Sequence, residues 1–216
     1  HMSGFVIMES IKKQQTKEGI ELYGYVGKLL FVDLTDQTLA IEDLSGQDAR
    51  NFIGGPSLGA KILFDRMPAH TPAFAPESMI GFVSGPTNGN AAFLGGRYTV
   101  VSKSPVYNGW NDSNSGGTFG MKMKKSGFDA IFVKGIAKEP VYLFIDNGNA
   151  EIRPASHLWG KTIIESENIL KEEIGDPRIG AALIGPAGER LSYMAAVMND
   201  SHRAAGRGGS GAVMGS

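Results

Sequence analysis

Residues 203–209, RAAGRGG, place two arginines among glycines and alanines, a combination that favours anion binding. Glycines at a helix entrance let a ligand approach backbone N–H groups, and successive N–H groups form a concave site for anions. Arginine adds planar, multidentate contacts to a phosphate or to the edge of a heterocycle. A flexible linker is the alternative, but linkers are usually rich in serine and glycine, and two arginines so placed are unusual. We therefore predict a site for a phosphate-bearing ligand.

A second glycine-rich segment, NSGGTFG at residues 114–120, also opens a predicted helix. It is not a Walker A loop, because it lacks Gly-Lys-Ser/Thr. It is not a dinucleotide fingerprint either, because its spacing differs and no fully buried strand comes directly before it. Alone, the segment is equally compatible with a phosphate loop and with a structural turn.

A third segment, GGRY at residues 95–98, leads into a predicted strand. An arginine at a strand edge is normally a solvated surface residue. The position of Arg97 beside a glycine loop favours a binding role. His157 and His202 have no partner at metal-ligand spacing, so we predict no histidine metal site.

The composition excludes several function classes. Among 216 residues, 21 are Lys or Arg and 22 are Asp or Glu, so the chain lacks the basic surplus of a general nucleic-acid binder. It has no cysteine, which excludes a disulfide, a thiolate zinc site, a cysteine nucleophile and an iron–sulfur cluster held by this chain alone. Glycine, at 30 residues, is about twice as frequent as its usual ~7%.

The N-terminal region is predicted to lie outside the domain. No stretch approaches the ~20 apolar residues of a membrane span, and the first residues have no basic region typical of a signal peptide. We interpret His1-Met2 as a tag remnant and residues 9–21 as a short helix or an arm. Residues 1–22 are thus an N-terminal arm and residues 23–216 the domain, with a cytoplasmic location and no membrane or nucleic-acid partner.

The hydrophobic pattern predicts alternating strands and helices. Hairpins are expected at 28–34 with 39–44 and at 141–146 with 150–154, the latter around a strong Asn-Gly turn signal. The other predicted strands are 79–84, 96–104, 130–134, 179–184 and 192–198, and the predicted helices are 57–66, 116–125 and 162–174.

Three short matches in the same order indicate an internal duplication. KLLFVD (28–33) resembles VYLFID (141–146), MIGFVSGPTNG (79–89) resembles IGAALIGPAGE (179–189), and SGGTFG (115–120) resembles RGGSGA (207–212). The fold class predicted is therefore α+β, with two β-rich halves of duplicated β-α-β units related by a pseudo-twofold axis. Such an axis would bring the two glycine loops close together.

The duplication also predicts a gap in the second half. In the first half the glycine loop is followed by a helix and a strand, whereas the second half stops inside its helix. We therefore expect the natural chain to continue past Ser216. A missing strand leaves an unpaired sheet edge, which tends to recruit another chain. We expect either self-association or the N-terminal arm lying in that gap.

Four segments, GGRYTVVSKSP (95–105), NSGGTFG (114–120), IGPAGE (184–189) and MNDSHRAAGRGGSGAVMGS (198–216), resemble the N-terminal domain of the aldehyde:ferredoxin oxidoreductase family of tungsten enzymes. The resemblance covers residues 23–216, and the last segment is highly specific. It implies an α+β domain of two related halves that forms the base for a tungsten bis-pterin cofactor, covered on its other face by helical C-terminal domains.

The resemblance also implies roles for individual residues. The positions that match the family's pterin-contacting residues are Arg97, Asn114, Gly116, Arg203, Ala204, Gly206 and Arg207. Backbone carbonyls at Asn114 and Ala204 would hold a Mg²⁺ ion that bridges the two pterin phosphates. No catalytic residue is assigned to this chain.

The chain departs from the family in lacking cysteine. Family members hold a [4Fe-4S] cluster through four cysteines in the C-terminal part, where the proposed acid/base residues also lie. For the full-length enzyme the resemblance implies oxidation of an aldehyde to a carboxylic acid, with electrons passing through the cluster to ferredoxin. The fragment alone is expected to be inactive and to carry no bound cofactor, and its self-association would give a homo-oligomer.

Two other interpretations stay open on the residues. One is a free-standing module that binds a nucleotide or another phosphate ligand through the same glycine–arginine loops. The other is a non-catalytic subunit whose partner chain supplies the cysteines. The residues identify neither the aldehyde nor the choice between tungsten and molybdenum.

Overall fold

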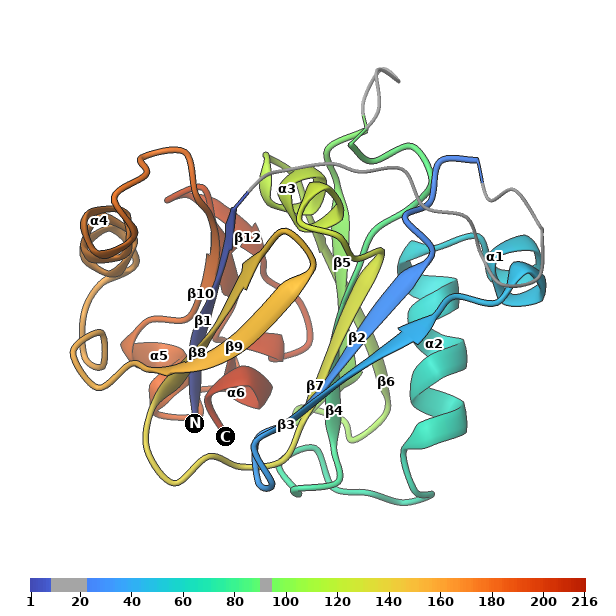
Figure 1. Ribbon diagram of the computed structural model, residues 1–216. Helices are drawn as coiled ribbons and strands as arrows, with labels where there is room; N and C mark the ends of the chain where they lie inside the picture. The colour runs from blue at the N-terminus through green and yellow to red at the C-terminus, as the bar shows by residue number, and fades with distance from the viewer. Residues whose placement is uncertain (9–22, 90–94) are drawn as a thin grey trace.

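The computed structural model describes residues 1–8, 23–89 and 95–216. Within these residues the chain forms a mixed α+β domain with two six-stranded sheets that pack face to face (Figure 1). Helices cover the outer face of each sheet. The predicted arm at residues 9–21 lies outside the described residues.

The first sheet is built from the N-terminal half. Its strand order is β3-β2-β7-β4-β5-β6, and only β2 and β7 are parallel neighbours. Its strands are β2 (Lys28–Asp33), β3 (Thr38–Asp43), β4 (Met79–Val83), β5 (Tyr98–Lys103), β6 (Trp110–Ser115) and β7 (Ala130–Lys134).

The second sheet repeats this arrangement position by position. Its order is β9-β8-β1-β10-β11-β12, and only β8 and β1 are parallel neighbours. Gly85 and Gly185 follow the equivalent strands β4 and β10. The predicted duplication is therefore confirmed in strand order. The strands of this sheet are β1 (Met2–Met8), β8 (Val141–Asp146), β9 (Asn149–Pro154), β10 (Gly180–Leu183), β11 (Val197–Asn199) and β12 (Arg203–Ala205).

The prediction that the domain begins at Tyr23 does not agree with the position of β1. Met2–Met8 lies inside the second sheet, paired with β8 on one side and β10 on the other. Met2 and Ile7 are buried, so this strand packs into the core of the fold. The alternative expectation, that the N-terminal arm fills the gap of the second half, matches the structure.

The helices are α1 (Gly46–Phe52), α2 (Gly55–Arg66), α3 (Phe119–Lys125), α4 (Ile163–Ile174), α5 (Pro186–Glu189) and α6 (Ser210–Gly215). The helices predicted at 57–66, 116–125 and 162–174 correspond to α2, α3 and α4, and the chain ends in a helix as expected, whereas α1 and α5 were not predicted. In α4, Thr162 accepts a hydrogen bond from the Glu165 amide while the Glu165 side chain accepts one from Thr162, and Gly175 ends the helix in the left-handed region. This capping box and glycine stop explain why α4 was predictable. The described residues contain no helix with the length and apolar content needed to cross a bilayer.

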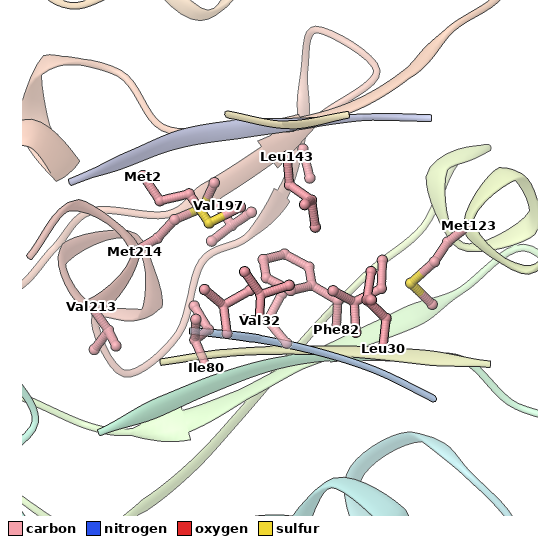
Figure 2. Close-up of a cluster of buried hydrophobic side chains, with 14 of the residues drawn as sticks. Met2, Leu30, Val32, Ile80, Phe82, Met123, Leu143, Val197, Val213 and Met214 are labelled. Carbon is pink, nitrogen blue, oxygen red and sulfur yellow. The ribbon is translucent and has the colours of Figure 1, made fainter. Parts of the chain in front are cut away.

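The main core lies between the two sheets (Figure 2). Leu30 and Phe82 of the first sheet face Leu143 and Val197 of the second, all at most 1% exposed. Helices α3 and α6 close opposite ends of this core, α3 with Met123 and α6 with Met214 (Figure 2). A second cluster packs α1 and α2 on the outer face of the first sheet, and a third packs α4 on the outer face of the second. This packing of one sheet on the other fixes the two glycine loops relative to each other.

Candidate functional site

The glycine–arginine segments of the two halves meet at a depression of about 370 Å³. The strands β6 and β12 lie along it, together with the residues that precede β5 and follow β12. The structure thus brings five of the predicted site residues together. The lining residues are Arg97, Asp112, Ser113, Asn114, Ala204, Gly206 and Arg207.

Arg97 is held in place by the neighbouring strand. Its Nε donates a hydrogen bond to Asn114 Oδ1 at 3.0 Å, and its Nη2 donates to the same oxygen. The side chain of Asn88 donates to the Arg97 carbonyl at 2.6 Å. Gly116 lies beside the guanidinium: a Cβ added at Gly116 would be 3.6 Å from Arg97 Nη1. The remaining N–H groups of Arg97 therefore form a fixed cationic donor at one wall of the depression.

Arg207 supplies the second cation, from the other half of the chain. Its backbone amide donates to Ser113 Oγ at 2.9 Å, and Ser104 Oγ donates to the Gly208 carbonyl at 2.8 Å. Gly208 and Gly209 both have positive φ, at 63° and 78°, so the loop makes a turn that residues with a Cβ rarely adopt. The arginine loop of the second half is therefore anchored on hydroxyl groups of the first half.

Two buried asparagines brace the loops reciprocally. Asn111 of the first half donates to Ser210 Oγ at 2.9 Å and to the Arg207 carbonyl at 3.3 Å. Asn199 of the second half donates to the Gly116 carbonyl at 2.9 Å and accepts from the hydroxyl of Ser115 at 2.7 Å. Each asparagine is at most 3% exposed. The relative position of the two arginines thus depends on side chains that cross between the halves.

The helix start at residues 116–118 is a structural turn rather than an anion site. The carboxylate of Asp200 accepts hydrogen bonds from the backbone amide and the hydroxyl of Thr118, at 2.5 and 2.8 Å. An added phosphate at this helix end would meet that carboxylate. Of the two interpretations left open for NSGGTFG, the structure supports the turn for its glycines, while Asn114 faces the depression.

Arg203 and Gly116 do not line the depression. Arg203 lies at the start of β12, opposite Asn199, and is exposed. Two lining residues, Asp112 and Ser113, were not among the predicted site residues. Both lie on β6, whose sequence WNDSNS has no apolar alternation and was not predicted as a strand. Burial alternates along β6 and places Asp112 and Asn114 outward and Ser113 inward. Because residues 111–115 are all polar, this alternation has no counterpart in the sequence that could have identified them.

The charges that line the depression suit an anion. Two arginines and one carboxylate line it, so the local charge is positive. The depression is open beside Gly206, since a Cβ added there would make only ordinary van der Waals contacts with Ala204 and Ala196. Among the described residues, no three His, Asp or Glu side chains form a metal-binding group. A hard cation here would depend on backbone oxygens and on the anion itself.

A positively lined depression thus lies between the halves of a duplicated α+β scaffold. Residues 29–216 match the family described as Aldehyde ferredoxin oxidoreductase, N-terminal domain, and the chain belongs to this family. It is 48% identical over 195 residues to the tungsten-containing aldehyde ferredoxin oxidoreductase of Pyrococcus abyssi, with 90% of this chain and 32% of the relative covered. It is 39% identical over 210 residues to the aliphatic sulfonate oxidoreductase, WOR-like subunit, of Pyrococcus furiosus, with 90% and 33% covered.

A solved structure supports the same fold. The active site complex BamBC of benzoyl coenzyme A reductase, in complex with 1,5-dienoyl-CoA, superposes with a TM-score of 0.87 at 38% identity. The superposition covers 89% of this chain and 29% of that chain. The chain therefore spans about a third of the length of the relatives it matches.

Proposed function

We propose that this chain forms one half of the binding site of a tungsten bis-pterin cofactor in an oxidoreductase of this family. The supporting observation is that Arg97 and Arg207, from different halves, line one depression together with Asn114, Ala204 and Gly206. The phosphates of the two pterins carry the negative charge that two fixed guanidinium groups stabilise. When bound, the cofactor supplies two-electron redox chemistry at its metal.

We assign the residue roles from the family resemblance together with the positions of these residues at the depression. Arg97 and Arg207 bind the phosphates, and Gly206 lets the backbone approach the pterin. The backbone carbonyls of Asn114 and Ala204 would hold a Mg²⁺ ion, which would add positive charge beside the phosphates. Gly116 and Arg203, beside the depression, contact the pterins.

The activity proposed for the whole protein is oxidation of an aldehyde to a carboxylic acid, in the cytoplasm, with ferredoxin as electron acceptor. This chain has no cysteine, so cysteines elsewhere in the whole protein hold the [4Fe-4S] cluster. The aldehyde itself is not identified, because relatives of comparable identity are named for an aliphatic sulfonate and for benzoyl coenzyme A. By itself this part of the protein is expected to be inactive.

The phosphate-binding role predicts specific, weak binding by the isolated chain. Backbone amides of ¹⁵N-labelled protein would be followed by NMR during titration with a 6-substituted pterin phosphate in the presence of Mg²⁺. We expect saturable shifts at residues 97, 114 and 204–207, with a Kd of the order of 1 mM. Arg97→Ala and Arg207→Ala should each weaken binding about 10-fold or more, because a charge-assisted hydrogen bond contributes about 1.5–3 kcal/mol.

The control variant is Arg178→Ala, which removes the same charge from a side chain that is 85% exposed and paired only with Asp176 among the described residues. It should bind as the unchanged chain does. A titration with ADP and Mg²⁺ distinguishes the alternative function. Equal or tighter binding of ADP at the same amides would indicate a nucleotide-binding module, and shifts that ignore both arginine substitutions would contradict the proposed site.

A further inference from the structure

The strand β1 occupies a central place in the second sheet, although it comes from the far end of the chain. It pairs in parallel with β8 over Met2–Met8 and antiparallel with β10 over Gly4–Ile7. Its counterpart in the first sheet is β7, which pairs in parallel with β2 and antiparallel with β4. The two strands also have the same register with their parallel neighbours. Gly4 of β1 is opposite Tyr142, the second residue of β8, and Ala130 of β7 is opposite Leu29, the second residue of β2. We call the space between β8 and β10 the strand slot.

The first sheet receives its central strand by a different route. There β7 follows helix α3 after only residues 126–129. The equivalent helix of the second half is α6, since α3 and α6 each follow a glycine loop and close one end of the core (Figure 2). In the second half, however, the strand slot holds residues joined to Tyr23 through residues 9–22.

The end of α6 lies where the strand slot begins. His1 Nδ1 is 3.0 Å from the carbonyl oxygen of Gly215, and the Val141 amide donates to the His1 carbonyl at 3.0 Å. Figure 1 shows the two chain ends side by side at this edge of the sheet. A strand leaving α6 would therefore enter the slot at the same point and run in the same direction as β1.

The family comparison separates β1 from the rest of the sheet. The residues that match the family begin at Leu29, so they include β8, β10 and α6 but not β1. The strands on both sides of the slot thus belong to the shared family domain, whereas the strand within it does not. The family match thus includes both flanking strands and α6 without the strand that occupies the slot here.

We infer that the strand slot is an exchangeable docking site, and that its competing occupant is an extended segment joined to the C-terminal end of α6. Backbone pairing with β8 and β10 selects such a segment by direction and register, as β-strand addition does elsewhere. A four-residue connector like residues 126–129 also closes a shorter loop than residues 9–22. The shorter loop favours the α6-linked strand by about sixfold in effective concentration. This inference is independent of cofactor binding.

The test uses the full chain with an extension. One variant carries, after Ser216, a copy of residues 126–134, which supplies the connector and strand of the first half. The matched control carries the same copy with prolines in place of Ile131 and Val133, which cannot donate to the ladder. Hydrogen exchange with mass spectrometry reports the protection of residues 2–8 and of the added segment.

We expect the amides of residues 2–8 to lose protection by about 100-fold or more in the first variant, while the added strand becomes protected. The proline control should keep residues 2–8 protected. Equal protection of residues 2–8 in both variants would overturn the inference. A circular permutant that starts at Tyr23 and carries residues 1–8 after Ser216 through a four-residue linker gives a second check. It should fold with β1 protected, and its failure to fold would also contradict exchangeability.

Discussion

Replacement of Asp129 by alanine is expected to lower the free energy of unfolding by about 3–5 kcal/mol, because it breaks a buried ion pair and leaves one charge without a partner. Asp129 is 2% exposed and lies 3.5 Å from Nζ of Lys124, whose side chain is 7% exposed. Its two oxygens also accept hydrogen bonds from the backbone amides of Val26 and Gly27, at 3.1 and 2.6 Å. The carboxylate therefore joins α3, the start of β2 and the start of β7.

The pKa shifts of the pair have the same physical origin. Burial raises the pKa of Asp129, and the nearby ammonium and the backbone amides oppose that shift. Burial likewise lowers the pKa of Lys124, and Asp129 opposes it. Lys124 also donates to the Gly85 carbonyl at 2.6 Å, so it cannot turn to solvent without losing that contact. An Asp129→Ala variant thus leaves two amides without an acceptor and a buried cation whose remaining acceptor is the neutral Gly85 carbonyl.

Chemical denaturation followed by circular dichroism measures this effect. The double variant Asp129→Ala with Lys124→Met should lose less stability than Asp129→Ala alone, because no charge remains buried. A surface substitution provides the control: Arg178→Ala, which removes the 85% exposed partner of Asp176, should change stability by less than about 1 kcal/mol. A loss of less than about 1 kcal/mol for Asp129→Ala would show that water reaches Lys124.

The apolar strands of the fold were predictable from the sequence. Residues 130–134, AIFVK, form a short apolar run that becomes β7 with the predicted bounds, because the strand is covered by the other sheet on one face and by helices on the other. The hairpin β8–β9 was likewise found, since Asn147-Gly148 provides the turn. Because the two halves are duplicated, the strand order of one half also applies to the other.

Polar and distant contacts were harder to predict. The inward side chains of β6 are Asn111, Ser113 and Ser115, which pair with polar groups of the other half rather than with apolar side chains. Hydrophobic periodicity therefore could not reveal this strand. The strand β1 has no partner close in sequence, since it pairs with β8 and β10, so only the repeat argument pointed to its place.

The candidate site was predictable only in part for the same reason. Arginine between glycines is unusual enough to single out Arg97 and Arg207, and the depression contains both. The residues of NSGGTFG alone do not show whether the backbone amides at the end of this loop already have a hydrogen-bond acceptor within the fold. Asp200, from the other half, takes the amide of Thr118, and no spacing within NSGGTFG predicts that contact.

Replacement of Asn199 by leucine is expected to destabilise the domain by about 3–5 kcal/mol, since two buried hydroxyl groups and the half-buried Gly116 carbonyl lose their partner, at about 1–3 kcal/mol for each fully buried group less any relaxation. Asn199 Oδ1 accepts from the Tyr98 hydroxyl at 3.1 Å and from the Ser115 hydroxyl at 2.7 Å, and Nδ2 donates to the Gly116 carbonyl at 2.9 Å. Tyr98 and Ser115 are 1% and 2% exposed, so water does not replace the lost contacts without rearrangement.

A triple variant isolates the hydrogen-bond contribution of Asn199 from its packing. Adding Tyr98→Phe and Ser115→Ala to Asn199→Leu removes two of the groups that the leucine leaves without a partner, so much of the lost stability should return. Denaturant midpoints measure stability, and the pterin phosphate titration measures the site. Since Asn199 holds the loop that follows Asn114, we expect the single variant, titrated where it is still folded, to bind at least about fivefold more weakly. Unchanged affinity in a destabilised Asn199→Leu chain would mean that Arg97 is positioned by Asn114 and Asn88 alone, and that the contacts crossing between the halves stabilise the fold without shaping the depression.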